Sequence, residues 1–176
     1  MSEKKIYEKL IRIFPDYPKK GINFIDWMPV VGNREAMREL INDMAELVSE
    51  RKFTKVAGLE TRGYLVGIPL AEKLGLGFVP IRKKGKLPGP CLSQEYDLEY
   101  GTDVIEIQAD AVCADDKVLI VDDLLATGGT VEAANKLIGR RTKDIVDLFF
   151  IELEDLGGIK HLQYPSFSLL KMKEKQ

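Results

Sequence analysis

The sequence is poor in histidine and cysteine. Its 176 residues include one histidine, His161, and two cysteines, Cys91 and Cys113, which lie too far apart for a Cys-x-x-Cys motif. A single histidine argues against a catalytic triad that uses histidine and against a histidine-rich metal site. Two separated cysteines are typical of reduced thiols, so we expect a cytoplasmic protein without disulfides.

The sequence also lacks long apolar runs and a strong charge of either sign. No apolar segment approaches the roughly 20 residues that a membrane-spanning helix needs, and residues 1–5 do not open a signal segment. A net charge of −2 does not favour nucleic acid or an anionic membrane as a partner, and we expect neither. The length fits a single domain over residues 1–176, and a hydrophobic content of 45% is enough for a core.

Strands and helices are expected to alternate along most of the chain. Short apolar runs predict strands at 56–59, 77–81, 104–107, 118–121, 145–151 and 167–170. Helical periodicity predicts helices at 3–13, 34–50, 64–74 and 131–138, and a short helix at 159–163. This alternation predicts an α/β fold with a mostly parallel central sheet and helices on both faces.

The segment from Val118 to Thr130 combines a buried strand, two acids and a glycine-rich turn before a helix. Gly128 and Gly129 lack a Cβ, so the turn can approach a ligand closely, and the N–H groups of the helix can bind an anion. This predicts a site for one phosphate. No lysine follows the glycines, which excludes a Walker A loop, while an ordinary tight turn capped by Thr127 remains the alternative.

Asp122 and Asp123 narrow the choice of ligand. Two carboxylates beside a phosphate site would repel the phosphate unless another group balanced their charge. The hydroxyls of a ribose can donate to both carboxylates while its 5-phosphate lies on the amides, and Mg²⁺ binds carboxylate and phosphate oxygens. The pattern therefore predicts a phosphorylated ribose as ligand.

Three motifs carry a family resemblance. Asp-Asp-Leu-Leu-Ala-Thr-Gly-Gly-Thr at 122–130 resembles the 5-phosphoribosyl-1-pyrophosphate (PRPP) motif of type I phosphoribosyltransferases, and its form is similar to that of the adenine phosphoribosyltransferases. Arg-Lys-x-Gly-Lys-Leu-Pro-Gly at 82–89 and Leu-Glu-Tyr-Gly at 98–101 match the same family. The resemblance covers about residues 14–170. It implies a type I phosphoribosyltransferase fold with a flexible hood at about 82–107 and an N-terminal arm for the base at about 14–29.

The resemblance implies a purine salvage enzyme that transfers 5-phosphoribosyl from PRPP to adenine, giving AMP and pyrophosphate. It implies Mg²⁺ bound with PRPP near the two acids, with no protein ligand assured, and a homodimer. It assigns the ribose to Asp122 and Asp123, the 5-phosphate to Ala126, Thr127, Gly128, Gly129 and Thr130, the pyrophosphate to Thr61, Arg62, Arg82, Lys83 and Lys86, the base to Asn23, Phe24, Ile25 and Leu125, and catalysis to Glu99. Trp27 and its apolar neighbours in the arm would be poorly placed in water, which also favours a dimer.

The arm departs from the family pattern. Ile25 replaces the usual arginine, Asn23 replaces an apolar residue, and Lys20 stands where proline is common. A phosphoribosyltransferase for another purine base therefore remains an alternative. So does a non-catalytic regulator that senses PRPP or purines, although Glu99 and the hood cations favour the enzyme. By themselves, the cations of 82–86 would be typical of a solvated basic loop.

The glycine-rich turn leads to one expectation about a variant. Gly128→Val adds a Cβ that should block the approach of PRPP to the amides. We expect PRPP binding to be lost while the fold survives.

The motif position of Glu99 beside the purine N7 leads to a testable prediction. General acid–base help is worth about 10²–10⁴ in rate, so Glu99→Leu should lose kcat/KM on that scale. If a proton is transferred, Glu99→Gln should be nearly as poor, because an amide cannot exchange a proton at neutral pH. The measurement is steady-state kinetics near saturating adenine, with PRPP binding as the control. Full activity in Glu99→Leu would remove Glu99 from the mechanism.

Overall fold

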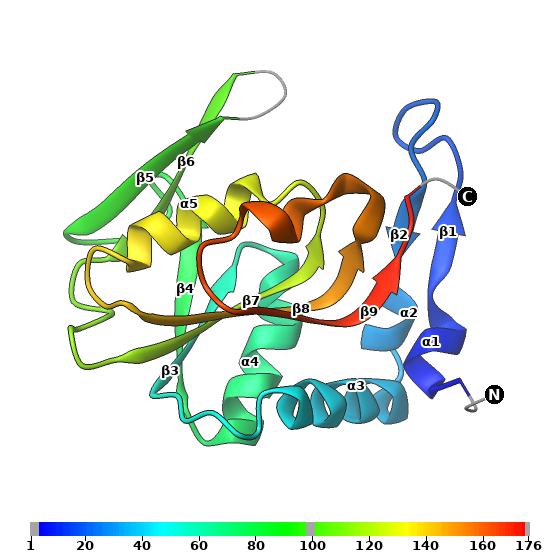
Figure 1. Ribbon diagram of the computed structural model, residues 1–176, viewed down its shortest axis with the longest axis horizontal. Coiled ribbons are helices and arrows are strands. Elements are labelled where there is room, and N and C mark those ends of the chain that lie inside the picture. The colour runs from blue at the N-terminus through cyan, green and yellow to red at the C-terminus, as the bar shows by residue number, and fades with distance from the viewer. Residues whose placement is uncertain (1–3, 98–100, 175–176) are drawn as a thin grey trace.

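A seven-stranded sheet forms the centre of the computed structural model, which describes residues 4–97 and 101–174 (Figure 1). Its strand order is β5-β6-β4-β3-β7-β8-β9. The strands are β3 (Lys55–Leu59), β4 (Gly77–Lys83), β5 (Cys91–Asp97), β6 (Thr102–Gln108), β7 (Lys117–Leu125), β8 (Asp144–Leu153) and β9 (Ser166–Met172). Within the described residues, no helix has the length and apolar character needed to cross a bilayer.

Most of the sheet is parallel. β3, β4, β7, β8 and β9 pair in parallel, whereas β6 pairs antiparallel with both β4 and β5. The predicted α/β fold with a mostly parallel sheet is therefore confirmed. From β3 the chain moves outward to β4 and later returns to β7 on the other side of β3. In such sheets ligands bind beyond the carboxyl ends of the strands at this reversal of order.

Helices cover both faces of the sheet (Figure 1). α3 (Arg34–Leu47) and α4 (Arg62–Leu74) share one core cluster with Leu119 and Val121 of β7. α5 (Gly129–Ile138) shares the other cluster with Val118 and Ile120. Alternate residues of β7 thus enter opposite cores, which explains why a strand buried on both faces has a continuous apolar sequence.

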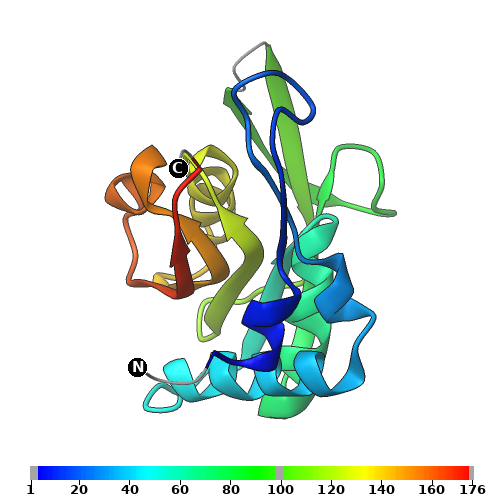
Figure 2. The ribbon, with the colours of Figure 1, turned by 90° about the vertical axis from the view of Figure 1, so that its right-hand side faces the viewer.

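The first helix is shorter than predicted. α1 (Ile6–Leu10) ends early, and β1 (Arg12–Phe14) pairs antiparallel with β2 (Phe24–Asp26) to form an arm hairpin. Pro15 disfavours helical geometry at the preceding residue, and β2 supplies the hydrogen bonds that a longer helix would have made. Figure 1 and Figure 2 show that the arm hairpin and the hood project beyond the same end of the sheet, with the arm near β9 and the hood at the opposite edge.

Trp27 lies in the short connection between β2 and α2 (Met28–Val31) and is fully buried within its own chain. The expectation that its solvation would favour a dimer was therefore wrong. Its ring packs edge-on against Phe150 at 5.6 Å, since the arm folds back onto the same core as α3 and α4. Exposed apolar side chains do occur in the arm, at Phe14 and Tyr17.

The described part of the hood is an antiparallel hairpin of β5 and β6 that extends one edge of the sheet (Figure 1). It joins the parallel strands only where Arg82 and Lys83 of β4 lie opposite Glu106 and Ile105. The hairpin therefore continues directly from the carboxyl end of β4. Its flexibility stays a prediction.

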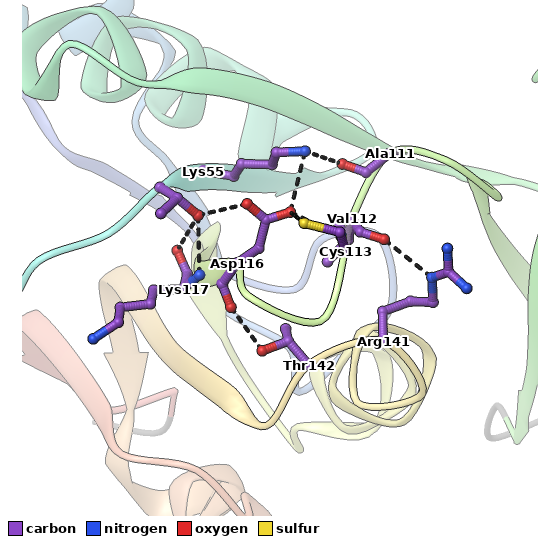
Figure 3. A network of polar contacts seen from close by, with 9 residues as sticks. Lys55, Ala111, Val112, Cys113, Asp116, Lys117, Arg141 and Thr142 are labelled. Atoms are coloured by element: carbon purple, nitrogen blue, oxygen red, sulfur yellow. Dashed lines mark hydrogen bonds and ion pairs between the residues drawn. The ribbon is translucent and has the colours of Figure 1, made fainter.

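A polar network joins the elements at the opposite, amino-terminal edge of the sheet (Figure 3). The Asp116 carboxylate accepts from the Thr54 hydroxyl at 2.7 Å and from the Cys113 amide at 2.8 Å, and it pairs with Lys55 at 3.2 Å. Burial would raise the pKa of Asp116, but these donors outweigh burial and hold the pKa well below its usual range. The Thr142 hydroxyl adds a bond to the Asp116 carbonyl. This network fixes the loop that leads from the hood into β7.

Cys91 and Cys113 are both free thiols, as expected.

A second buried cluster attaches α5 to the sheet. The side-chain amide of Asn135 on α5 and the hydroxyl of Ser166 on β9 both donate to Oδ2 of Asp147 on β8, at 3.0 and 3.1 Å. Asp147 is fully buried, and burial raises its pKa to about 7 although both donors oppose the shift. Among the described residues, Oδ1 of Asn135 and Oδ1 of Asp147 have no partner, which suits a neutral carboxyl carrying a proton.

This cluster leads to a pH prediction. A carboxyl with a raised pKa binds its proton more tightly in the folded chain, so its contribution to the free energy of unfolding falls as pH rises from about 4 to about 7. Asp147→Asn imitates the neutral carboxyl and does not titrate. Between pH 5 and pH 8 the variant should therefore gain roughly 2 kcal/mol of stability relative to wild type. Urea unfolding of both proteins at the two pH values measures this, and a difference independent of pH would contradict it.

Candidate functional site

Two loops meet at the point where the strand order reverses. One leads from β3 into α4 through Glu60 and Thr61, and the other leads from β7 into α5 through 126–128. Because β3 and β7 are parallel neighbours, both loops leave the same edge of the sheet side by side. The structure thus brings together the two strand–turn–helix units that the sequence predicts.

The loop after β7 has the shape of an anion cradle. Gly128 caps α5 with a left-handed backbone (φ 90°), and the first helical bond runs from the Glu132 amide to the Gly128 carbonyl at 2.8 Å. The amides of 129–131 therefore lack an intrahelical acceptor. A cavity of about 100 Å³ is lined by Asp122 and residues 124–131. Whole ligands usually occupy several hundred Å³, so this cavity suits a single group such as phosphate.

Gly128 also has a packing role that the sequence did not reveal. A Cβ on Gly128 would lie 2.9 Å from the carbonyl oxygen of Gly158, in the 3₁₀ turn η2 (Gly158–His161). A Cβ on Gly158 would lie 2.1 Å from the carbonyl of Ala126. The cradle and η2 thus pack backbone against backbone. Gly128→Val would therefore strain this packing, and we expect the variant to lose stability as well as PRPP binding. The assignments of Thr127 and Thr130 to phosphate stay predictions.

The two acids at the end of β7 point to different partners. Asp122 lies by the cradle, with Oδ1 accepting from the Asp123 amide at 2.9 Å. Oδ1 would also be 2.9 Å from a Cβ on Gly63, so a glycine there lets the first turn of α4 approach β7. Burial raises the pKa of Asp122 well above its usual range, and the charge of Asp123 adds to the effect. Asp123 is itself buried and pairs with Arg62 Nε at 2.7 Å. Of the two acids, Asp122 lines the cradle cavity and Asp123 does not, so the assignment of Asp123 to the ribose stays a prediction.

The hood cations are paired with acids. Glu60 accepts from Lys86 Nζ at 2.5 Å and from Arg82 Nε at 3.3 Å. Lys83 pairs with Asp103 on β6 at 3.0 Å. Burial would raise the pKa of Glu60, but Lys86, the Lys83 amide and Arg82 outweigh it and bring the pKa to about 2. The three hood cations expected to face pyrophosphate are thus neutralised here by two acids, Glu60 and Asp103, to which sequence reasoning gave no role. An acid directly before the Thr61-Arg62-Gly63 turn was the available clue for Glu60.

The residues assigned to the base have dissimilar surroundings. Phe24 packs edge-on against Tyr17 at 5.3 Å, and the Arg62 guanidinium lies 5.6 Å from the centre of its ring. A cavity of about 260 Å³ is lined by Phe24, Tyr17, Phe14 and Asp26, all from the arm. This aromatic cavity suits a flat ligand.

Three other predicted base residues are less available. The Ile25 side chain is buried in the core, so only its main chain could face a base. The Asn23 side chain donates to the Glu174 carbonyl at 2.6 Å. Leu125 is buried beneath the cradle. Thr61 is exposed at the start of α4, as a pyrophosphate ligand requires. Glu99 lies outside the described residues, and its role stays a prediction.

The hood reaches the cradle through Tyr96. The Thr130 hydroxyl hydrogen-bonds the Tyr96 phenol, which also lies 3.5 Å from Asp103 Oδ2. A cavity of about 320 Å³ lies between β5 and α5 beside Gly129. Beyond the carboxyl end of α5, Arg140 donates to the Ser93 carbonyl at 2.9 Å. The hood therefore contacts both ends of α5.

A larger cavity, of about 590 Å³, lies between α3 and α4 and shares no lining residue with the cradle. Met37, Ile41 and Pro69 give it a mainly apolar wall, with Arg34 and Arg38 at its border. Since the paired acids and the cradle lie elsewhere, its size alone does not make it the reaction site.

Comparisons with known proteins agree with this geometry. Residues 31–148 match the family model of the phosphoribosyl transferase domain. The chain is 48% identical over 170 residues to an adenine phosphoribosyltransferase of Shewanella amazonensis, covering 96% of this chain and 94% of that one. It is 45% identical over 173 residues to one of Methylobacillus flagellatus, covering 96% and 98%.

Solved structures give the same result. An adenine phosphoribosyltransferase of Thermoanaerobacter pseudethanolicus superposes with a TM-score of 0.89 at 48% identity, covering 94% of this chain and 98% of that one. The enzyme of Saccharomyces cerevisiae, solved with adenine and an imino-altritol bisphosphate, gives a TM-score of 0.88 at 40% identity, covering 93% and 96%.

The cradle leads to a paired prediction. Gly128→Ala forces a side chain into a left-handed backbone and against Gly158, so it should lower the free energy of unfolding by roughly 1–3 kcal/mol. Gly129→Ala is the matched control, because the nearest atom to its Cβ is the Asp97 carbonyl at 3.9 Å. Gly129→Ala should keep wild-type stability. Chemical unfolding of both variants measures the change in stability, and PRPP titration measures the change in ligand binding. A fully stable Gly128→Ala protein would disprove the packing role.

Proposed function

The chain belongs to the adenine phosphoribosyltransferases of the phosphoribosyl transferase domain family, and on this premise we propose how its residues serve the reaction. It is a purine salvage enzyme that transfers 5-phosphoribosyl from PRPP to adenine, giving AMP and pyrophosphate. The single observation that carries the residue assignments is the phosphate-sized cradle beside Asp122, at the strand reversal.

The 5-phosphate binds the amides and hydroxyls of 126–130, and the ribose hydroxyls donate to Asp122 and Asp123. The first turn of α4 supports this arrangement, since the positive end of its dipole lies against the two carboxylates. Positive charge develops on the ribosyl ring as the bond to pyrophosphate breaks. The carboxylates lie on the sugar side and stabilise that charge, so positioning and electrostatics supply most of the catalysis.

The pyrophosphate binds Thr61, Arg62 and the hood cations Arg82, Lys83 and Lys86. The three hood cations are held by Glu60 or Asp103 before the substrate arrives. A pKa of about 2 keeps Glu60 ionised at neutral pH, so it competes with pyrophosphate for Lys86 and Arg82. Exchange of one anion for another keeps the cations ordered without leaving them unpaired.

Mg²⁺ is the expected cofactor, bound together with PRPP near Asp122 and Asp123. In the described part of the chain, no group of three or more acidic, histidine or cysteine side chains could hold a metal. The residues present nevertheless fit Mg²⁺, which commonly binds one or two carboxylates and completes its shell with substrate phosphates and water. When bound, it neutralises charge on the leaving pyrophosphate.

Glu99 manages the proton at N7 while N9 of adenine attacks the ribose. Hood closure excludes water, which would otherwise hydrolyse PRPP. The Thr130–Tyr96 contact gives the hood a fixed point beside the phosphate cradle.

The enzyme works as a homodimer in the cytoplasm. Two free cysteines suit a reducing compartment, and the exposed Ile68 of α4 and Met28 of α2 offer apolar surface to a second copy. Sedimentation at assay concentration tests the assembly, and an active monomer would refute it.

Base choice is tested by assaying adenine, hypoxanthine, guanine and xanthine with PRPP and Mg²⁺. Adenine should exceed the others by at least about 100-fold in kcat/KM, because buried polar groups left unpaired by a wrong base reject it strongly. Equal turnover of hypoxanthine or guanine would assign another base. PRPP binding without turnover of any base would favour a regulator.

A further inference from the structure

Trp27 reaches the ribose side of the site from the arm. Its indole Nε1 donates to Asp123 Oδ2 at 2.7 Å, and both side chains are buried. The same oxygen pairs with Arg62 Nε at 2.7 Å. Three segments that are far apart in the sequence therefore meet at one carboxylate oxygen: the arm, the first turn of α4 and the end of β7.

Trp27 and Arg62 both bind Oδ2, so neither donor uses the other oxygen of Asp123, while the Asp122 side chain is a further neighbour of this carboxylate. A buried carboxylate with a single donor could turn about its side-chain bonds. Two donors from different directions hold Oδ2 in place, so Oδ1 has one position from which to accept a hydroxyl.

Packing fixes the donor as firmly as the acceptor. The Trp27 ring meets Phe150 edge-on at 5.6 Å and 79°, and Ile25 lies in the same buried cluster. An indole so confined cannot follow Asp123 if the carboxylate moves. Trp27 therefore acts as a rigid support rather than as a flexible partner.

We propose that Trp27 is a positioning residue for ribose: its N–H holds the Asp123 carboxylate so that the second oxygen accepts a ribose hydroxyl of PRPP. The inference rests on the proposed role of Asp123 in the ribose subsite. It gives the arm a second duty, because the segment that carries Phe24 for the base also orders the sugar side.

The test is Trp27→Phe, which keeps a ring in the core and removes the N–H donor. Hydrogen bonds to charged groups justify an expected loss of roughly 10-fold in affinity for ribose 5-phosphate. Affinity for inorganic phosphate, which uses the cradle alone, should stay within about 2-fold of wild type, since a free phosphate makes no contact with Asp123. Calorimetry on the full chain measures both. Equal losses for the two ligands, or no loss for either, would overturn the proposal.

Tyr7→Phe is the matched control. Tyr7 packs edge-on against Phe150 in the same cluster, at 5.7 Å, and its hydroxyl donates to Asp43 at 2.9 Å. The variant also removes one donor to a carboxylate from this cluster, but away from the ribose side. It should lose stability and keep wild-type affinity for both ligands, whereas a loss of ribose 5-phosphate binding in Tyr7→Phe would make the Trp27 effect a general packing effect.

A double-mutant cycle with Asp123→Asn shows whether Trp27 acts through Asp123. If it does, Trp27→Phe should cost little further affinity for ribose 5-phosphate once Asp123 is changed, whereas additive losses would overturn the proposal. Trp27 is the single tryptophan of the sequence, so wild-type emission should change with ribose 5-phosphate more than with phosphate. None of these measurements needs turnover. Failure of the wild type to make AMP would instead count against the proposed function.

Discussion

The site depends on how two adjacent carboxylates are kept at the end of one buried strand. Asp122 and Asp123 would repel each other and a nearby phosphate, so each needs compensation from its own direction. The first turn of α4 lies against Asp122, and Arg62 and Trp27 bind Asp123. The reversal of strand order between β3 and β7 makes this possible, because it places α4 and the cradle on either side of the pair.

Charge compensation extends outward from this pair in the same manner. Glu60 and Asp103 hold the hood cations in the absence of substrate, and the Glu60 pKa of about 2 keeps that acid charged. Removing either acid would leave cations crowded at one sheet edge. The acids therefore order the pyrophosphate side in advance, although they also compete with the ligand that they prepare for.

Backbone packing sets the position of the cradle. Gly128 and Gly158 approach so closely that neither tolerates a Cβ, and the Asn135–Asp147 cluster holds α5 to β8 behind the cradle. At the far edge of the sheet, Asp116 joins the loop before β7 to β3. The phosphate loop is thus supported by its neighbours at both ends of the sheet, and its geometry does not rely on the loop sequence alone.

The sequence by itself determined the parallel sheet, its helices and the phosphate turn, because hydrophobic periodicity, runs of β-branched residues and glycine pairs are local properties of the chain. It also placed Arg62 and the two acids near the carboxyl ends of two strands of the sheet. Only the tertiary structure decided their partners. Trp27 and Asp123 are far apart in the chain but share a hydrogen bond. Glu60, which follows β3, meets Lys86, which follows β4, and Gly128 packs against Gly158 of η2. Contacts of this kind follow from the packing of whole elements, which no local pattern encodes, and so the partners of each charge appeared only in the folded chain.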